Sequence, residues 1–407
     1  MHPASVIRKR QVVRADQVPV KGLRNGSSSV AERIGGISWA HFVNDGAANF
    51  LPGVLPVILV ELNFSAGLAG SIMAALLIGQ GLQPFIGLLA DRIGGRSLMI
   101  AGIVGTAFGA ALVALAQSVL VLVIALLIIG VFNAVFHPQM LAATRQIAAK
   151  RAAGAMSVVL VGGEIGRGVW PALASAILVA FGRESLVVLA APGVMTALLL
   201  LRWAPKLEPQ RKATRIDWRT HAGPLGALVA FCALRALVNF VLITFLPLVW
   251  HQHGGNMTTG ASLITVLYVV GVVGNLGGGW LGDRIGRRAL LVTSMLVLLI
   301  ATALIPLISG IAFWLAIAIA GVCLFATLPL TVLIGQDFVP EARAFGSGIA
   351  LGMANAIGAL GLLIVSPLAD MFSVETPMWI ACGAAAIALV LALSMPLPSH
   401  LRDNPAS

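Results

Sequence analysis

The sequence predicts an all-α membrane protein with twelve transmembrane helices in two tandem six-helix bundles, and three observations support this prediction. Hydrophobic residues make up 59% of the 407 residues, and the mean hydropathy is +0.98. Apolar segments of about 18 or more residues recur from about residue 35 to residue 397. A short motif that combines glycine with aspartate and arginine appears twice, 192 residues apart.

The composition excludes several other classes of protein. No water-soluble domain needs this much apolar surface, and the apolar runs lack the alternation of a transmembrane barrel. The 45 glycines and 20 prolines also fit membrane helices, in which both residues are more frequent than in soluble helices. All three cysteines lie inside apolar runs, so neither a disulfide framework nor a thiolate metal cluster is indicated.

The net charge of +11 is distributed as in a membrane protein. With both termini in the cytoplasm, 23 of the 26 Lys and Arg residues fall in cytoplasmic segments, and only Arg183 lies outside. This asymmetry is the positive-inside bias, and it predicts that both termini are cytoplasmic. No aromatic residues alternate with the basic ones, so we expect no nucleic-acid partner.

Twelve apolar segments are long enough to cross about 30 Å of hydrocarbon as helices. They are residues 35–60, 66–90, 98–116, 119–143, 153–180, 185–203, 223–250, 258–282, 288–308, 311–336, 343–371 and 375–397. The longest polar break after the N-terminal tail separates the first six from the last six. We therefore expect a cytoplasmic basic tail (1–34), a first bundle (35–203), a cytoplasmic linker (204–222), a second bundle (223–397) and a cytoplasmic tail (398–407).

The repeated motif reads GLLADRIGGR at residues 87–96 and GGWLGDRIGRR at residues 278–288. Both copies fall between the second and third helix of a half, which we expect to be a cytoplasmic loop. The motif G-x-x-x-D-R-x-G-x-R at this place resembles the signature loop of the major facilitator superfamily. Four further stretches resemble the fosmidomycin-resistance group of bacterial efflux transporters, namely HFVNDG (41–46), LQPFIGLLADRIG (82–94), VFHP (135–138) and GGEIGRGVWP (162–171).

The resemblance implies a secondary active transporter of the bacterial inner membrane, expected to be a monomer, that works by alternating access. It also implies that the loop residues form a cytoplasmic latch. The expected gating residues are Asp91, Arg92, Arg96, Asp283, Arg284 and Arg288. The chain departs from the family pattern at one position. Proton antiporters of the superfamily often carry an arginine in helix four, where this chain has Leu127. A proton relay built on that arginine is therefore not expected.

Ionisable residues inside membrane helices are costly, so their default interpretation is functional. Asp45 and His41 lie four residues apart and can share one face of the first helix, and Asn44 and Asn49 extend this polar patch. A carboxylate in a partly apolar cavity can exchange a proton or a substrate. We therefore expect proton coupling at Asp45 and His41, while a carboxylate hydrogen-bonded to backbone near a helix end stays open as an alternative.

Two further ionisable features occur in the first half. Glu164 and Arg167, spaced i, i+3, either neutralise each other or serve proton coupling and substrate binding, respectively. The resemblance implies that the glycines around them pack against a second-half helix. His137 precedes Pro138, and its ring either relays protons or caps the carbonyl that the proline leaves free.

Arg235 gives the second half its own basic group in the membrane. Together with Arg167 it would suit an anionic substrate, because a guanidinium binds a carboxylate or phosphonate through two parallel hydrogen bonds. Snorkelling or pairing of Arg235 with a carboxylate stays open. Asn44 and Asn49 complete the expected substrate-binding residues.

No ATP-binding motif or catalytic nucleophile appears, so we expect a transporter rather than an enzyme, and no cofactor. Together with the resemblance, this predicts proton-coupled antiport that exports a small organic compound, anionic or amphipathic and drug-like, as in drug resistance. The expected partners are the substrate, protons and the lipid bilayer. Two alternatives stay open. A transition-metal transporter would use His41, Asp45, His137 and Met140, and a non-transporting sensor or scaffold would use the basic tail 8–33.

Overall fold

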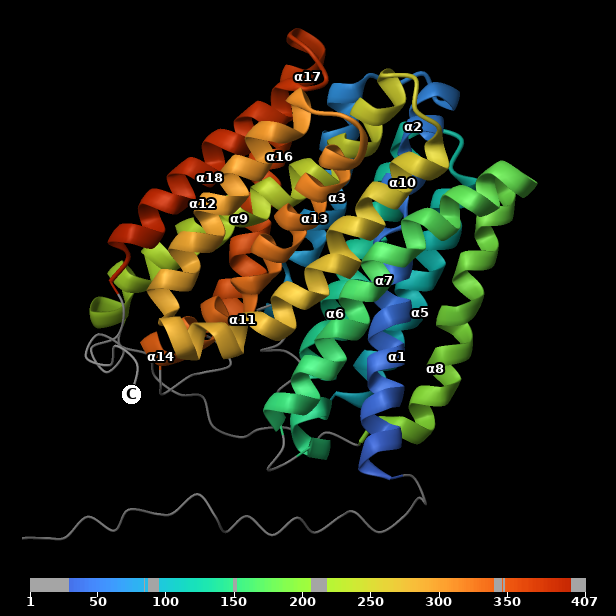
Figure 1. Cartoon of the computed structure of the whole chain (residues 1–407). Coiled ribbons are helices and arrows are strands. Elements are labelled where there is room, and N and C mark those ends of the chain that lie inside the picture. Colours follow the sequence, from blue (N-terminus) through green and yellow to red (C-terminus); the bar gives the residue numbers. More distant parts are fainter. Residues whose placement is uncertain are drawn as a thin grey trace, which may run out of the picture.

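The computed structural model describes residues 29–83, 85–86, 95–148, 152–205, 218–339, 346 and 348–396. These residues form helices joined by short connections, and no strand occurs among them. Figure 1 shows the helices packed along one another as a bundle. We call the end of this bundle at which Val30 and Ser394 lie the terminal end, and the other end, at which Glu61 and Met371 lie, the opposite end.

Among the described residues, the first half of the chain contains five helices long enough to span a membrane and the shorter apolar helix α3. The first span is broken at Phe50, because Pro52, the second residue of the next helix, has no N–H to continue the hydrogen-bond ladder of the first. The elements are α1 (Val30–Asn49), α2 (Leu51–Glu61), α3 (Ala66–Gln80), α5 (Arg96–Leu115), α6 (Val119–Ala148), α7 (Ala152–Phe181), the 3₁₀ helix η2 (Arg183–Ala190) and α8 (Ala191–Trp203).

The second half repeats this arrangement with two π-helical turns, which are frequent at functional positions of helices. Of these turns, η3 interrupts one span and η6 begins another. The elements are α9 (Trp218–Gln252), α10 (Met257–Thr265), η3 (Val266–Val270), α11 (Gly271–Ile285), α12 (Arg287–Leu304), η4 (Ile305–Leu307), α13 (Gly310–Ala326), α14 (Leu328–Phe338), η6 (Ile349–Met353), α16 (Ala354–Val365), α17 (Leu368–Met371) and α18 (Thr376–Ser394).

The predicted membrane fold is confirmed. Among the described residues, eleven helices are long and apolar enough to cross a membrane, and α3 is a shorter apolar helix of 15 residues. The second predicted span continues to residue 90, but residues 84 and 87–90 lie outside the described part of the chain. The twelve predicted spans therefore correspond to the eleven long helices and α3. The division into two separate bundles stays a prediction.

The two halves of the chain meet through α7 against α10 and η3, α3 against α16, and α2 against α9 and α10. At the opposite end, the main-chain N–H of Gly67 in α3 donates to Oδ1 of Asp370 in α17 at 2.8 Å. One turn further along α3, a side chain at Gly70 would overlap Ser366. These contacts join the halves closely at the opposite end.

The glycines of α7 bring this helix against α1. A Cβ at Gly162 would meet the main-chain oxygen of Ser38, one at Gly163 would meet the ring of His41, and one at Gly166 would meet the main-chain oxygen of Phe42. The expectation that these glycines pack against the second half is therefore wrong for all three. Among the neighbouring glycines, Gly168 does pack there, on Tyr268 and Val269 of η3. The close approach of α7 to α1 positions the site.

Candidate functional site

Asp45 lies at the centre of a buried polar cluster between α1, α6 and α7. Its side chain is fully buried. Oδ2 pairs with Nη2 of Arg167 at 2.6 Å, and Oδ1 accepts hydrogen bonds from Nδ2 of Asn133 at 3.1 Å and of Asn44 at 3.3 Å. A buried carboxylate needs such partners, because burial without them is costly. We call the set the Asp45 cluster, which consists of Asp45, His41, His137, Arg167, Asn44 and Asn133.

His41 lies one turn before Asp45 on α1, as its sequence spacing predicts. Its Nε2 is 3.2 Å from Oδ2 of Asp45, and its Nδ1 is 2.7 Å from the main-chain oxygen of Val159 in α7. The ring fits between the two helices because Gly163 has no side chain there. The predicted shared face of His41 and Asp45 is thus found in the structure.

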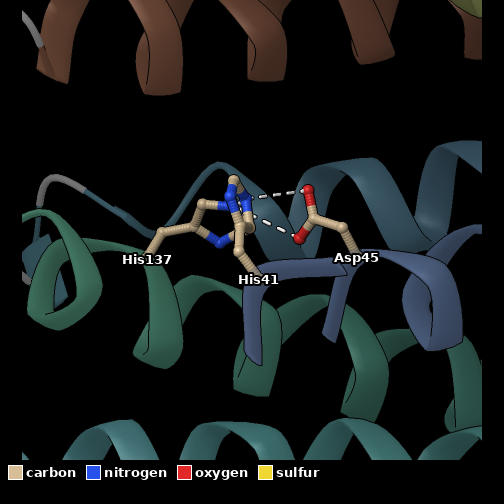
Figure 2. Close-up of side chains that lie close together, drawn as sticks. All are labelled: His41, Asp45 and His137. Carbon is tan, nitrogen blue, oxygen red and sulfur yellow. Dashed lines mark hydrogen bonds and ion pairs between the residues drawn. The ribbon is translucent and has the colours of Figure 1, made fainter. Parts of the chain in front are cut away.

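His137 reaches the same carboxylate from α6 (Figure 2). Its Nε2 lies 3.3 Å from Oδ1 of Asp45 and 3.2 Å from Nε2 of His41. Its Nδ1 lies 2.8 Å from the main-chain oxygen of Asn133. The carbonyl that Pro138 leaves free in an α-helix is that of Ala134, four residues earlier, so the ring binds a different carbonyl from the one expected for a cap.

Arg167 does not form its ion pair with Glu164, the neighbour that the i, i+3 spacing offers. It pairs with Asp45 across the interface of α1 and α7, where the glycines of α7 bring the backbones together. The Arg167 side chain keeps 29% of its surface exposed, whereas Asp45 has none exposed. Arg167 is therefore the more exposed member of this ion pair.

Glu164 points from α7 to the second half of the chain. Its Oε1 accepts a short hydrogen bond from Nδ2 of Asn275 in α11. Oε2 is buried and has no hydrogen-bond partner among the described residues. This contact is a polar link between the halves, next to the Asp45 cluster.

Arg235 lies in α9 with only 4% of its surface exposed. No carboxylate in the described part of the chain lies within ion-pair distance of it, and its Nε has no hydrogen-bond partner there. The titratable side chains nearest to it in electrostatic terms are those of Cys232 on its own helix, Tyr268 of η3 and, from the first half, Glu164. Tyr268 accepts a hydrogen bond from Nδ2 of Asn239 at 3.2 Å. The alternative that a nearby carboxylate pairs with Arg235 is not found in this conformation.

Asn49 and Asn44, both predicted to bind substrate, are buried on α1. Nδ2 of Asn49 donates to the main-chain oxygen of Asp45 at 2.8 Å, so this amide supports the end of its own helix. Nδ2 of Asn44 contacts the Asp45 carboxylate, and its Oδ1 has no hydrogen-bond partner among the described residues. Asn44 therefore contacts the Asp45 carboxylate through its side chain, whereas Asn49 contacts the main-chain oxygen of Asp45.

The predicted gating residues are only partly visible. Asp91, Arg92 and the side chain of Asp283 lie outside the described part of the chain, and Arg96 begins α5. Arg284 stacks on the ring of Trp280 at 3.9 Å. Arg288 donates to the main-chain oxygens of Leu393 at 3.0 Å and Met395 at 2.7 Å. The contacts of Arg284 and Arg288 lie within the second half, and a latch stays a prediction.

Three donor atoms of the Asp45 cluster could hold a metal ion. The ligand atoms of His41, Asp45 and His137 lie within 4.8 Å of one another, and all three residues are buried. Hydrogen bonds from Nδ1 to main-chain oxygens orient both rings, as in many metal sites. However, Arg167 already places one positive charge on the carboxylate that a cation would need.

Sequence reasoning missed several polar residues of this region. Asn133 lies four residues before His137, a spacing that would have placed both on one face of α6. Asn275 is the only polar side chain in the run GVVGNLGGG, and such an isolated amide is a signal that could have been used. Asn239 gives the same kind of signal in the run ALVNFVLITF, but the sequence does not show that its amide contacts Tyr268.

Comparison with known proteins shows which proteins this chain is similar to. The family model described as Major Facilitator Superfamily matches the chain twice, over residues 37–349 and 228–407. The fosmidomycin resistance protein of Escherichia coli (strain K12) is 24% identical over 356 residues, covering 84% of this chain and 87% of that protein. The gentisate transporter of Corynebacterium glutamicum is 24% identical over 389 residues, covering 88% and 86%, respectively.

Two solved structures have the same fold. A bacterial homologue of the human lysosomal transporter Spinster, in an inward-facing and occupied conformation, matches with a TM-score of 0.75 and 16% identity, covering 89% of this chain and 96% of that chain. A point mutant of the nucleoside transporter NupG matches with a TM-score of 0.74 and 16% identity, covering 90% and 100%, respectively.

Proposed function

Since the chain belongs to the Major Facilitator Superfamily of membrane transporters, we propose that it is a proton-coupled antiporter that exports a small organic compound by alternating access. The proposed location is the bacterial inner membrane, with both termini in the cytoplasm. The single observation that carries the proton coupling is the fully buried carboxylate of Asp45, in contact with Arg167 and two imidazoles.

The Asp45 cluster supports proton coupling through the chemistry of its members. Carboxylate and imidazole are the side chains that most readily gain and lose protons in transport proteins. A proton gained near Asp45 weakens the attraction between the Asp45 carboxylate and the Arg167 guanidinium. Of these two side chains, only that of Arg167 is partly exposed. The protonation state of the cluster and the position of a substrate-facing guanidinium are thereby linked.

Arg235 and Glu164 support a substrate site shared by the two halves. Arg167 and Glu164 come from α7, and Arg235 comes from α9. Transporters of this type bind substrate between their halves, which then rock around it. A buried guanidinium without a carboxylate partner in the described part of the chain suits an anionic or other acceptor group of the cargo, whose apolar part would meet the surrounding membrane helices.

The direction of transport rests on a relative. One similar protein carries the name fosmidomycin resistance protein, and export is one way in which a transporter confers resistance. A proton gradient directed inward drives export only by exchange, so export implies antiport. We propose the same direction for this chain.

Transport into proteoliposomes tests the proposal. The purified full-length protein is placed in vesicles with an imposed pH gradient, and a panel of labelled small organic compounds is added outside. We expect at least one compound to accumulate on the more acidic side, and a protonophore to abolish this accumulation. Accumulation that persists after the protonophore, in every compound that is carried, contradicts proton coupling.

Transition-metal transport is the second candidate, favoured by the convergence of His41, Asp45 and His137. Met140 is buried in α6, on the same helix as His137. Arg167 weighs against a metal, because a divalent cation beside its guanidinium would be a buried like-charge contact. Uptake of zinc, cobalt or manganese ions by the same vesicles, lost in His137→Gln, would favour the metal and contradict the organic cargo.

A further inference from the structure

A groove lined by aromatic side chains lies on the outer face of the first half, away from the Asp45 carboxylate. It runs between α1, α7 and α8 and has a volume of about 510 Å³, within the range of about 300–1,000 Å³ that is usual for ligand pockets. α8 lies at the edge of the bundle beside α1 (Figure 1). Met195 and Leu199 of α8 line the groove and are exposed. The groove therefore opens at a surface that the bilayer covers.

The wall of the groove is a row of packed aromatic rings. The ring of Trp39 stacks on that of Phe42, with centroids 5.3 Å apart, and Phe42 meets Trp170 edge to face at 6.4 Å. Trp170 can pack against α1 because Gly46 has no side chain, and a Cβ there would overlap the indole. Nε1 of Trp39 donates to Oγ1 of Thr196 in α8 at 3.1 Å. This indole N–H is thus paired within the wall, and the surface that the wall presents to an occupant is apolar.

Basic side chains lie at the terminal end of the groove. Trp203 ends α8 there and packs on α1 at Gly36, where a Cβ would overlap its ring. Nε of Arg33 donates to the main-chain oxygen of Trp203 at 3.0 Å. No carboxylate of the described residues lies within ion-pair distance of Arg33, so the rest of its guanidinium has no counter-charge there. Arg202 pairs with Glu32 at 2.9 Å, but both side chains are exposed, and exposed ion pairs are weak.

The net charge at this end of the groove is positive. Arg33 and Arg202 outnumber Glu32, and residues 204–215, into which the chain continues from α8, contain four basic residues and one acidic residue. Basic clusters next to a membrane helix attract anionic lipids, and a guanidinium binds a phosphate through parallel hydrogen bonds. An apolar groove with a positive end is complementary to a molecule that has an apolar chain and an anionic head.

We propose that this groove binds an anionic phospholipid, with an acyl chain along the aromatic wall and the phosphate at Arg33 and Arg202. A free phosphate would leave the apolar wall uncovered, and a neutral apolar molecule would leave the basic end without a counter-charge. The inference goes beyond the proposed function, because the site is separate from the Asp45 cluster and does not depend on the cargo. The lipid joins α8 to α1 and, by binding only the folded protein, raises its thermal stability.

Quenching of tryptophan fluorescence by brominated lipids tests the inference. The full-length protein is placed in phosphatidylcholine nanodiscs that contain equal fractions of brominated phosphatidylglycerol, which is anionic, or brominated phosphatidylcholine, which is zwitterionic. We expect stronger quenching by the anionic lipid. Trp39→Phe should lose part of this difference, whereas Trp379→Phe should keep it. Trp379 is the matched control, because it lies in α18, outside the groove, and is 45% exposed against 46% for Trp39. Equal quenching by the two lipids in the wild type overturns the inference.

Variants of the basic end test the position of the phosphate. Arg33→Gln and Arg202→Gln should each lower the affinity for phosphatidylglycerol relative to phosphatidylcholine about fivefold, the usual effect of one arginine near an anionic membrane surface. The control is Arg183→Gln, because Arg183 also binds a main-chain oxygen, that of Ala116, but lies at the opposite end. Arg202→Gln loses only an exposed ion pair, so it serves as the test even if Arg33→Gln does not fold. An unchanged lipid preference in Arg202→Gln overturns the inference.

Two other occupants of the groove would give different results. A second copy of the chain would shield the groove tryptophans from both lipids, and the particle mass would correspond to two chains. A transported compound would displace the brominated lipid from the groove when it is added. Either result overturns the inference. Because lipid binding is measured without a pH gradient, its failure leaves the proposed function standing, and a failure of pH-driven transport leaves the lipid site standing.

Discussion

Nη2 of Arg167 lies 2.6 Å from Oδ2 of Asp45, although Glu164 is three residues away on the same helix as Arg167. The partner thus comes from a different helix, and Glu164 is left to bind Asn275 of the second half. Three charged side chains of the first half are in this way divided between a cluster within the half and a link across the halves.

Asp45→Asn should abolish pH-driven transport and reduce stability. The substitution leaves the partly exposed guanidinium of Arg167 without its counter-charge. Loss of one partner of a fully buried ion pair costs on the order of 3–5 kcal/mol, and the 29% exposure of Arg167 makes the expected cost smaller. Thermal unfolding in detergent and flux in vesicles measure the two effects. The matched control is Glu61→Gln, since Glu61 pairs with Arg183 at 3.1 Å with 41% of its side chain exposed. Equal loss of transport in both variants would show that Asp45 has no special role.

Arg235→Gln should weaken the binding of anionic substrates far more than that of neutral ones. A hydrogen bond to a charged group contributes about 1.5–3 kcal/mol, which corresponds to roughly a 10- to 150-fold change in affinity. Competition binding with a pair of compounds that differ only in an acidic group measures this difference. An equal effect on both compounds would mean that Arg235 is a structural residue.

Gly163→Ala should disturb the Asp45 cluster without touching a charged group. The added methyl would overlap the ring of His41, and overpacking of this kind costs about 1–3 kcal/mol. We expect slower pH-driven flux and lower thermal stability. Gly35→Ala, on α1, is the control, because nothing lies within 4 Å of a Cβ at that position. Normal coupling in Gly163→Ala would argue that the approach of α7 to α1 does not position the site.

Asp370→Asn should favour opening of the halves at the opposite end. The Asp370 carboxylate accepts the N–H of Gly67 in the first turn of α3, and a negative charge at a helix N-terminus contributes about 1 kcal/mol. The ratio of open to closed states should rise about fivefold. Alkylation of a cysteine at Ser366, which is fully buried in this conformation, reports the opening. An unchanged alkylation rate would remove Asp370 from the contact that closes this end.

The sequence predicted the fold well because each membrane-spanning helix requires a long run of apolar residues, which is visible in the sequence. The apolar segments, the shared face of His41 and Asp45, and the position of the ionisable residues within membrane helices all follow from composition and helical period. The pairing of Arg167 with Asp45 does not, because it depends on how closely α7 approaches α1. The glycines of α7 signal a close approach but do not say which helix is approached.

The same limit applies to the link between the halves. Glu164 is visible in the sequence as a charge in a membrane helix, but its partner Asn275 lies 111 positions away. No periodicity connects the two positions, and only the packing of α7 against α11 brings them together. The sequence therefore identifies candidate residues of the site one at a time, but only the structure shows which of them are in contact.

The central claim, that substrate and protons are exchanged at the Asp45 cluster, is tested most directly by following both in the same vesicles. A one-for-one exchanger under a gradient of one pH unit supports a substrate gradient of up to about tenfold, because tenfold corresponds to about 1.4 kcal/mol. We expect the wild type to move protons against each substrate molecule carried, and Asp45→Asn to move none. Substrate movement without proton movement in the wild type, or unchanged proton exchange in Asp45→Asn, would contradict the claim.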